Sequence, residues 1–175
     1  MTDRSLPLRW TTRFGECLTL RPIDAGDAER AEAFLLALSF GTRYFRFGRG
    51  DFVYTPEEVA RLCTVGAADG LHLIATHVAA GRESMVGSAR WVPDDEPGTC
   101  EFSTVVGDAW QRRGLGHRLM QALIDDATYR GMRRMTGKVL ATNRAMINFV
   151  EALGFVLESA SVPGPVRRVS LQLTR

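Results

Sequence analysis

The chain has 175 residues, of which 45% are hydrophobic and 24% charged, and its formal net charge is +2. This composition is typical of one folded domain, and so small a net charge argues against nucleic acid or an anionic membrane as a partner. Cys17, Cys63 and Cys100 are odd in number and lack zinc spacing, which favours a reducing cytoplasm. No segment is typical of a signal peptide or a membrane span. We expect one cytoplasmic domain over residues 1–175, with 1–16 as an N-terminal extension or first hairpin strand.

Strand and helix signals alternate in the first third of the chain. Cys17–Arg21 alternates in polarity and predicts a strand, entered through a turn at Gly15-Glu16. Asp24 can cap a following helix, since its side chain can accept from a backbone N–H of the first turn. That helix would carry an apolar stripe formed by Ala28, Ala31, Phe34, Leu35 and Leu38.

Two further short elements follow that helix. Residues 39–49 predict a short irregular or helical stretch. Thr55-Pro56-Glu57-Glu58 is a capping box with Pro at the first helical position, which predicts a helix from there to about Thr64.

Three strands then come in succession. Leu71–Ala79, Met85–Pro93 and Cys100–Val106 are predicted strands, antiparallel because their connections are short. The next helix would stop near Gly131, and its inward face is formed by Leu115, Leu119, Leu123, Ile124 and Ala127.

The C-terminal part predicts one strand, one helix and a hairpin. Arg134–Leu140 is a strand, parallel to the one before the preceding helix because that helix is a crossover. Asn143 or Thr142 caps a helix closed by Gly154, and its inward residues are Met146, Phe149, Val150 and Leu153. Phe155–Ser161 and Val166–Leu173 form a hairpin through Pro163-Gly164-Pro165. The expected fold class is α+β, a mixed α/β sheet with helices on its faces.

The turn between residues 107 and 118 is the most informative motif, because a strand ends there and an amphipathic helix begins. A helix N-terminus presents unpaired N–H groups and a partial positive charge to an anion. A Walker A loop is excluded because the chain's only lysine is Lys138. The dinucleotide pattern Gly-x-Gly-x-x-Gly fails because Leu119 stands where its last glycine belongs. Gln-x-x-Gly-x-Gly fits at Gln111, Gly114 and Gly116, with an ordinary glycine-bearing turn as the alternative.

Gln-x-x-Gly-x-Gly is the acyl-CoA signature of the GNAT acetyltransferase superfamily, and other segments extend the likeness. Asn143–Phe155 resembles the family's second motif, in which an Asn opens a helix that ends in Leu-Gly-Phe, and Leu18–Asp24 resembles its first strand. Within that superfamily the chain resembles most the acetyltransferase domain of bacterial Pat-type protein lysine acetyltransferases. The matching segments are Ser39–Phe47, Ala89-Arg90, Glu101–Gly116 and Asn143–Met146.

The resemblance implies a fold, a cosubstrate and a set of binding residues. The fold would be a mostly antiparallel, partly splayed sheet of six to seven strands with helices on both faces. Acetyl-CoA would be the cosubstrate, without a metal, and the backbone of Val105 and Val106 would bind its pantetheine arm. The residues implied to bind it are Val105, Val106, Gln111, Arg112, Arg113, Gly114, Leu115, Gly116, His117 and Asn143. Arg112 and His117 could equally be solvated, and Asn143 could be a helix cap alone.

Glu101 is the residue that the resemblance implies as general base. It lies thirteen positions before Gly114, the separation of the Pat-like pattern, while its strand position alone is equally typical of an exposed glutamate. Val150 stands where many relatives carry a proton-donating Tyr, a replacement that Pat-like proteins share. Water or Tyr129 are the remaining donors, and the sequence favours neither.

The function that these motifs indicate is acetyl-CoA-dependent N-acetyl transfer to a lysine ε-amine of a protein, by direct attack in a ternary complex. We expect Arg43, Arg46 and Arg49 to hold acidic residues that flank the lysine. The alternatives are a small-molecule amine acetyltransferase and a non-catalytic CoA-binding regulatory domain. No metal, nucleic acid or membrane partner is expected, and a homodimer stays open.

Overall fold

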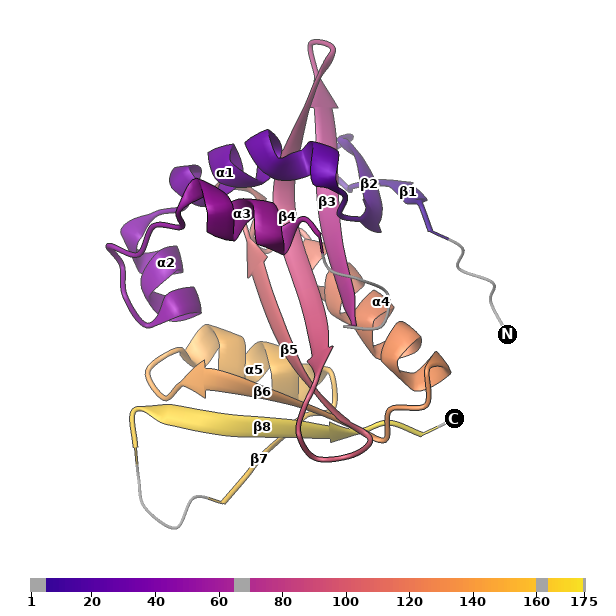
Figure 1. Ribbon diagram of the computed structural model, residues 1–175, viewed down its shortest axis with the longest axis vertical. Helices are drawn as coiled ribbons and strands as arrows, with labels where there is room; N and C mark the ends of the chain where they lie inside the picture. Colours follow the sequence, from indigo (N-terminus) through magenta and orange to yellow (C-terminus); the bar gives the residue numbers. More distant parts are fainter. Residues whose placement is uncertain (1–5, 65–69, 160–163, 175) are drawn as a thin grey trace.

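One twisted sheet of eight strands organises the molecule, with the order β1-β2-β3-β4-β5-β6-β8-β7 (Figure 1). The computed structural model describes residues 6–64, 70–159 and 164–174. The strands are β1 (Leu8–Thr11), β2 (Cys17–Pro22), β3 (Leu71–Ala79), β4 (Arg82–Pro93), β5 (Thr99–Val106), β6 (Arg134–Leu140), β7 (Val156–Leu157) and β8 (Val166–Gln172). The helices are α1 (Ala28–Ala37), α2 (Phe40–Phe47), α3 (Pro56–Leu62), α4 (Leu115–Tyr129) and α5 (Arg144–Ala152), with 3-10 turns η1 (Ala25–Asp27) and η3 (Asp108–Trp110).

The strands pair antiparallel except at one place, where β5 runs parallel to β6. Helix α4 is the crossover between those two strands, so the predicted parallel step and the mixed fold class are confirmed. The predicted six to seven strands are fewer than the eight observed. The short strand β1 pairs with β2 around the predicted turn, and the two-residue β7 completes the sheet at the other edge.

Helices cover both faces of the sheet (Figure 1). On one face lies α4, whose residues Leu115, Leu119, Leu123 and Ala127 are at most 2% exposed, as their helical spacing predicts. On the other face α1 and α3 pack over β3 and β4 through a second apolar cluster that includes Phe34, Val59 and Ile74. These two layers leave α2 beside the end of β5.

Side-chain caps start three of the helices. The capping box at Thr55 and Glu58 is present and begins α3. Ser39 caps α2, and Asn143, rather than Thr142, caps α5. Asp24 forms a capping box as predicted, but it begins the 3-10 turn η1 that leads into α1.

Two strand boundaries differ from the prediction. Strand β4 begins three residues earlier than expected, because Ala80 and Gly81 both have positive φ and make a two-residue turn that lets pairing continue to the tip. The strand predicted at Phe155–Ser161 is only Val156–Leu157 within the described residues. It pairs with β8 as a hairpin, and of the predicted turn Pro163-Gly164-Pro165 only Pro163 lies outside the described residues.

A buried carboxylate, Asp27, ties α1 to the sheet. Its side chain is fully buried and accepts two hydrogen bonds of 2.7 Å from Arg21 of β2 and one of 2.8 Å from Arg30 of α1. Burial alone would raise the pKa of Asp27, but these guanidinium groups and the N–H of Asp24 outweigh it and hold that pKa below its ordinary value.

We predict that Asp27→Asn lowers the free energy of unfolding by about 3–5 kcal/mol, since it leaves two guanidinium groups without their buried partner. Asp51→Asn, at an exposed ion pair with Arg49, is the matched control and should cost less than about 1 kcal/mol. Because the folded pKa of Asp27 is depressed, its contribution is complete above about pH 4 and is lost as the pH falls through the folded pKa. Urea unfolding at several pH values measures both effects, and equal costs for the two variants would contradict the assignment.

Candidate active site

Strands β5 and β6 form a fork. They pair in parallel at only three positions, Thr99 with Arg134, Cys100 with Met135 and Glu101 with Thr136, and beyond Glu101 the two strands diverge. The remainder of β5 pairs with β4 alone. Glu101 therefore lies at the apex of the fork, and the unpaired edge of β5 lines one of its arms.

The backbone of Val106 faces the open side of that fork. Gly107 donates its N–H to Val86 of β4 at 2.9 Å, and alternate residues of a strand point their polar groups to opposite sides. The N–H and carbonyl of Val106 consequently point away from β4. Its carbonyl accepts a hydrogen bond of 3.1 Å from the Gln111 side chain, and its N–H faces the same open side.

The turn after β5 presents a bare helix N-terminus. Arg112 and Gly114 both have positive φ, of 57° and 83°, and Gly114 is the N-cap of α4 without any capping side chain. The N–H groups of Leu115, Gly116 and His117, in the first helical turn, lack intrahelical partners by geometry. A Cβ on Gly114 would have no atom within 4 Å, so this surface is open, as a phosphate site requires.

The side chains of the turn divide into those that face solvent and those that hold the fold. Arg112 and His117 are exposed, and Leu115 is 2% exposed in the core, so it offers only its backbone. Arg113 forms an ion pair with Glu16 at 2.5 Å and stacks near Phe14 and Trp110, which directs it toward the β1–β2 loop.

Asp108 joins this turn to helix α2, a link that the sequence analysis did not identify. Its carboxylate accepts from the Ser39 N–H at 2.9 Å, the Ser39 hydroxyl at 2.6 Å and the Thr42 hydroxyl at 2.7 Å. Burial would raise the pKa of Asp108, but these donors outweigh it and keep that pKa low. The Gln111 amide also donates to the Thr42 hydroxyl at 3.2 Å. Gln111 therefore stabilises the contact with α2, besides being part of the Gln-x-x-Gly-x-Gly motif.

Glu101 makes an ion pair that the sequence analysis also missed. The only lysine of the chain, Lys138, lies on the facing strand β6 and places its Nζ 2.8 Å from Glu101 Oε2. The Glu101 side chain is 35% exposed and that of Lys138 is 63% exposed. A cation thus already sits where a base would meet a protonated amine.

A small cavity, here called the inner cavity, lies between the sheet and helices α1–α3. It holds about 40 Å³ of space accessible to water, room for a few small atoms. Its polar lining comprises Arg46, Tyr54, His72, Ser88, Arg90, Ser103 and Thr104. The register of β4 and β5 puts Glu101 and Ser103 on the same face as Ser88 and Arg90, so this cavity and the apex of the fork open on one face.

His72 in this cavity is neutral and its tautomer is set by its partners. Burial lowers its pKa to about 4. Its Nδ1 lies 2.9 Å from the Leu62 carbonyl, which can only accept, so Nδ1 carries the hydrogen. Its Nε2 then accepts the hydrogen of the Ser88 hydroxyl at 2.8 Å.

The other predicted site residues have plain positions. Asn143 caps α5 by accepting from the Met146 N–H at 3.1 Å. Val150 is fully buried in the core. Tyr129 is 86% exposed at the far end of α4, about 21 Å along the helix from the turn, so its position does not suit a proton donor there.

Of the three arginines predicted to flank an acceptor lysine, the structure brings only Arg46 into the inner cavity. Arg49 pairs with the exposed Asp51, and Arg43 lines a separate hollow between α1 and Phe52. Over residues 6–64, 70–159 and 164–174, no group of three His, Cys, Asp or Glu side chains could hold a metal ion. No helix in those same ranges is long and apolar enough to cross a membrane.

Comparison with known proteins defines the class. The fork, the bare helix N-terminus and the mixed sheet belong to an acetyltransferase, and residues 39–155 match the model of the acetyltransferase (GNAT) family. Because this match covers well over half of the chain, the protein belongs to the GNAT family.

Three relatives place it more closely. An acetyltransferase of Pseudomonas aeruginosa is 34% identical over 142 residues, which are 81% of this chain and 76% of that protein. Acetyltransferase Pat of Mycolicibacterium smegmatis is 35% identical over 153 residues, 86% of this chain but only 44% of Pat, so the chain spans less than half of that relative. The GNAT domain of Streptomyces lividans PAT superposes with a TM-score of 0.83 at 26% identity, covering 95% of this chain and 96% of that domain.

We predict that Gly114→Glu abolishes measurable binding of acetyl-CoA. The residue has a φ of +83°, which strains any side chain, and a carboxylate there would repel the pyrophosphate at the helix N-terminus. Gly81→Glu is the matched control, since Gly81 has a φ of +75°, equally open surroundings and a place at the distant β3–β4 tip. Calorimetry should show affinity lost in the first variant and kept in the second, and unchanged affinity in Gly114→Glu would remove the turn from the binding site.

A second prediction concerns the link to α2. Asp108→Ala removes the carboxylate that accepts three hydrogen bonds from Ser39 and Thr42, so the first turn of α2 should open more readily. Amide hydrogen exchange in Phe40–Phe47 should accelerate by about tenfold or more, while β3 keeps its protection. Asp51→Ala serves as the control, and equal protection of α2 in all three proteins would show that Asp108 does not hold the helix.

Proposed function

We propose that this acetyltransferase transfers the acetyl group of acetyl-CoA to the ε-amine of a lysine on a folded protein, by direct attack in a ternary complex. The observation that carries the proposal is the place of Glu101, at the apex of the fork and on the face that holds the inner cavity. The similarity to Pat of Mycolicibacterium smegmatis and to the Streptomyces lividans domain supports a Pat-like acceptor.

The chain's own groups suit the cosubstrate. The free N–H groups at the start of α4 would hold the pyrophosphate, with exposed Arg112 beside them. The backbone of Val106 would bond a pantetheine amide at the unpaired edge of β5, whereas the N–H and carbonyl of Val105 point toward β4, so Val105 would only lie beside the arm. Asn143 would reach the same arm from the start of α5. Acetyl-CoA supplies an activated acetyl group as a thioester.

The chemical step needs a base near the amine. A lysine amine has a pKa of about 10.4 and is mostly protonated near neutrality, so it must lose a proton before or during attack. Glu101 takes that proton, the neutral nitrogen attacks the thioester carbonyl carbon, and the C–S bond breaks as the thiolate leaves. The nitrogen then loses its second proton to solvent, which leaves a neutral amide. The N–H of Val106 faces the side where the carbonyl oxygen gains charge.

Lys138 has a defined part in this scheme. Its ammonium group forms an ion pair with the Glu101 carboxylate at 2.8 Å. The acceptor's ammonium must displace it before a proton can pass to Glu101. The exposure of Lys138 makes that displacement easy, because an exposed ion pair contributes little free energy. The proton on the leaving thiolate would come from solvent, since Val150 is buried and apolar.

To identify the acceptor, the enzyme is incubated with acetyl-CoA and a bacterial lysate, and newly acetylated proteins and metabolites are detected by mass spectrometry. The proposal expects new acetyl groups on lysine side chains, dependent on the active enzyme. Efficient turnover of a free amino acid or amino sugar, with no labelled protein, would establish the small-molecule alternative. Binding of CoA without turnover of any amine would establish a regulatory domain.

We predict that Glu101→Gln lowers kcat by about 10²–10⁴ while acetyl-CoA affinity stays near that of the parent. The amide keeps the size of the side chain but cannot accept the amine's proton. Glu151→Gln, on the exposed face of α5, is the control and should leave kcat unchanged. Steady-state release of CoA measures the effect, and parental turnover in Glu101→Gln would place the base elsewhere.

A further inference from the structure

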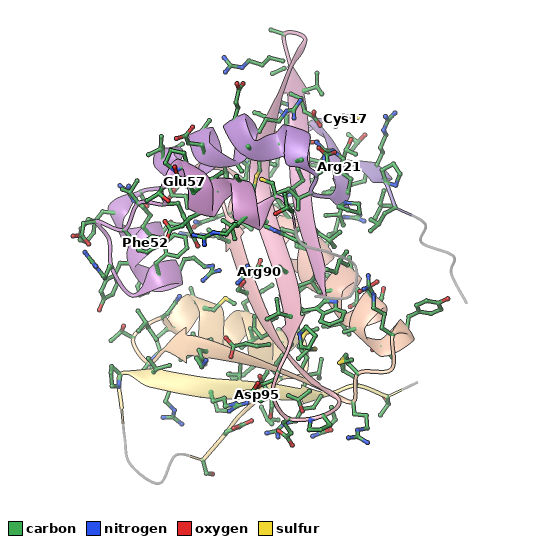
Figure 2. All side chains as sticks on the ribbon, viewed as in Figure 1. Cys17, Arg21, Phe52, Glu57, Arg90 and Asp95 are labelled. Carbon is green, nitrogen blue, oxygen red and sulfur yellow. The ribbon has the colours of Figure 1, made fainter. Side chains whose placement is uncertain are left out.

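Two guanidinium groups of the inner cavity have no acceptor. Arg46 comes from α2 and Arg90 from β4, and both line the cavity (Figure 2, where Arg90 is labelled near the middle of the sheet). Within the described residues neither side chain makes a hydrogen bond or an ion pair, and Arg46 stacks over the Phe47 ring at 4.9 Å. Two half-buried cations that lack an acceptor can bind an anionic ligand that supplies one.

The rest of the lining adds donors rather than counter-charge. No Asp or Glu is among the described residues that line the cavity. His72 is neutral, and its Nε2 is occupied by the Ser88 hydroxyl. Burial and the neighbouring Arg90 charge lower the pKa of Arg46, against the opposing effects of Tyr54 and of Glu101 at the apex of the fork. The cavity is therefore positive and rich in donors.

The cavity also lies at a useful distance from the proposed base. Glu101 pairs with Val92, and Arg90 pairs with Ser103, so Glu101 and Arg90 are diagonal neighbours on one face, about 7–8 Å apart. That span equals about two residues of extended peptide. With room for a few small atoms, the cavity fits a carboxylate group.

We propose that Arg46 and Arg90 bind a carboxylate of the acceptor, carried by an acidic side chain within about two positions of the target lysine. This inference rests on the proposed function, since it specifies the acceptor of that same site. The two guanidinium groups bond the carboxylate in the inner cavity while the lysine amine meets Glu101. Arg90 was not among the arginines expected from the sequence, because only the β4–β5 register brings it there.

The experiment compares two acetyl-acceptor peptides that differ only in Glu or Gln next to a single lysine. The wild-type enzyme should prefer the Glu peptide by about tenfold or more in kcat/KM. Arg46→Gln and Arg90→Gln should bring that ratio close to one, while Arg49→Gln, whose side chain pairs with Asp51 outside the cavity, should keep the wild-type ratio. Equal turnover of the two peptides by the wild type would overturn the proposal, and so would a preference that survives in both cavity variants.

Two further arms separate this inference from the proposed function. Calorimetry with the acetylated product peptides, carrying Glu or Gln, tests carboxylate binding in the wild type without turnover. This measurement tests carboxylate recognition even if a cavity variant fails to fold. If free amino acids are acetylated in an Arg46- and Arg90-dependent way and peptides are not, the protein-lysine acceptor fails but carboxylate recognition stands. If no amine is acetylated, the proposed function fails, and equal calorimetric affinity for both peptides would then overturn the cavity's role as well.

Discussion

The site depends on the early end of parallel pairing between β5 and β6. Three residue pairs join the strands, and pairing stops at Glu101 and Thr136. A longer ladder would consume the backbone groups of β5 that now face the fork, and a shorter one would detach β6, β8 and β7 from the rest of the sheet. The divergence leaves polar backbone groups unpaired within the protein, and such groups need an outside partner. An amide-bearing pantetheine arm is a partner of that kind.

The second constraint is that one turn, residues 107–114, contacts both the start of α4 and the start of α2. Asp108 and Gln111 precede the bare start of α4, and their side chains also hold Ser39 and Thr42 at the start of α2. Helix α2 carries Arg46 into the inner cavity. A movement of the turn on cosubstrate binding would thus be transmitted to the acceptor side through direct hydrogen bonds, which fits attack within a ternary complex.

The sequence predicted most of the fold because its signals are local. Alternation located the strands, and the stripe from Leu115 to Ala127 located α4 with its buried face. The turn at Ala80-Gly81 escaped prediction because Ala at positive φ is uncommon, so β4 was expected to start late. The Glu101–Lys138 ion pair, the cavity position of Arg90 and the Asp108–Ser39 contact were missed for another reason: each depends on strand register or on partners far apart in the chain. Glu101 was reached only through family resemblance, since its strand position alone is equally typical of a solvated residue.

The central claim is that the fork and the start of α4 together seat acetyl-CoA beside Glu101. Its most direct measurement is a backbone amide NMR titration of the wild-type protein with acetyl-CoA. We expect the largest shifts at Val105, Val106 and the first turn of α4, with a smaller shift at Asn143 and little change in β1 or β7. Shifts confined to other surfaces, with Val106 and Gly114 unmoved at saturation, would contradict it.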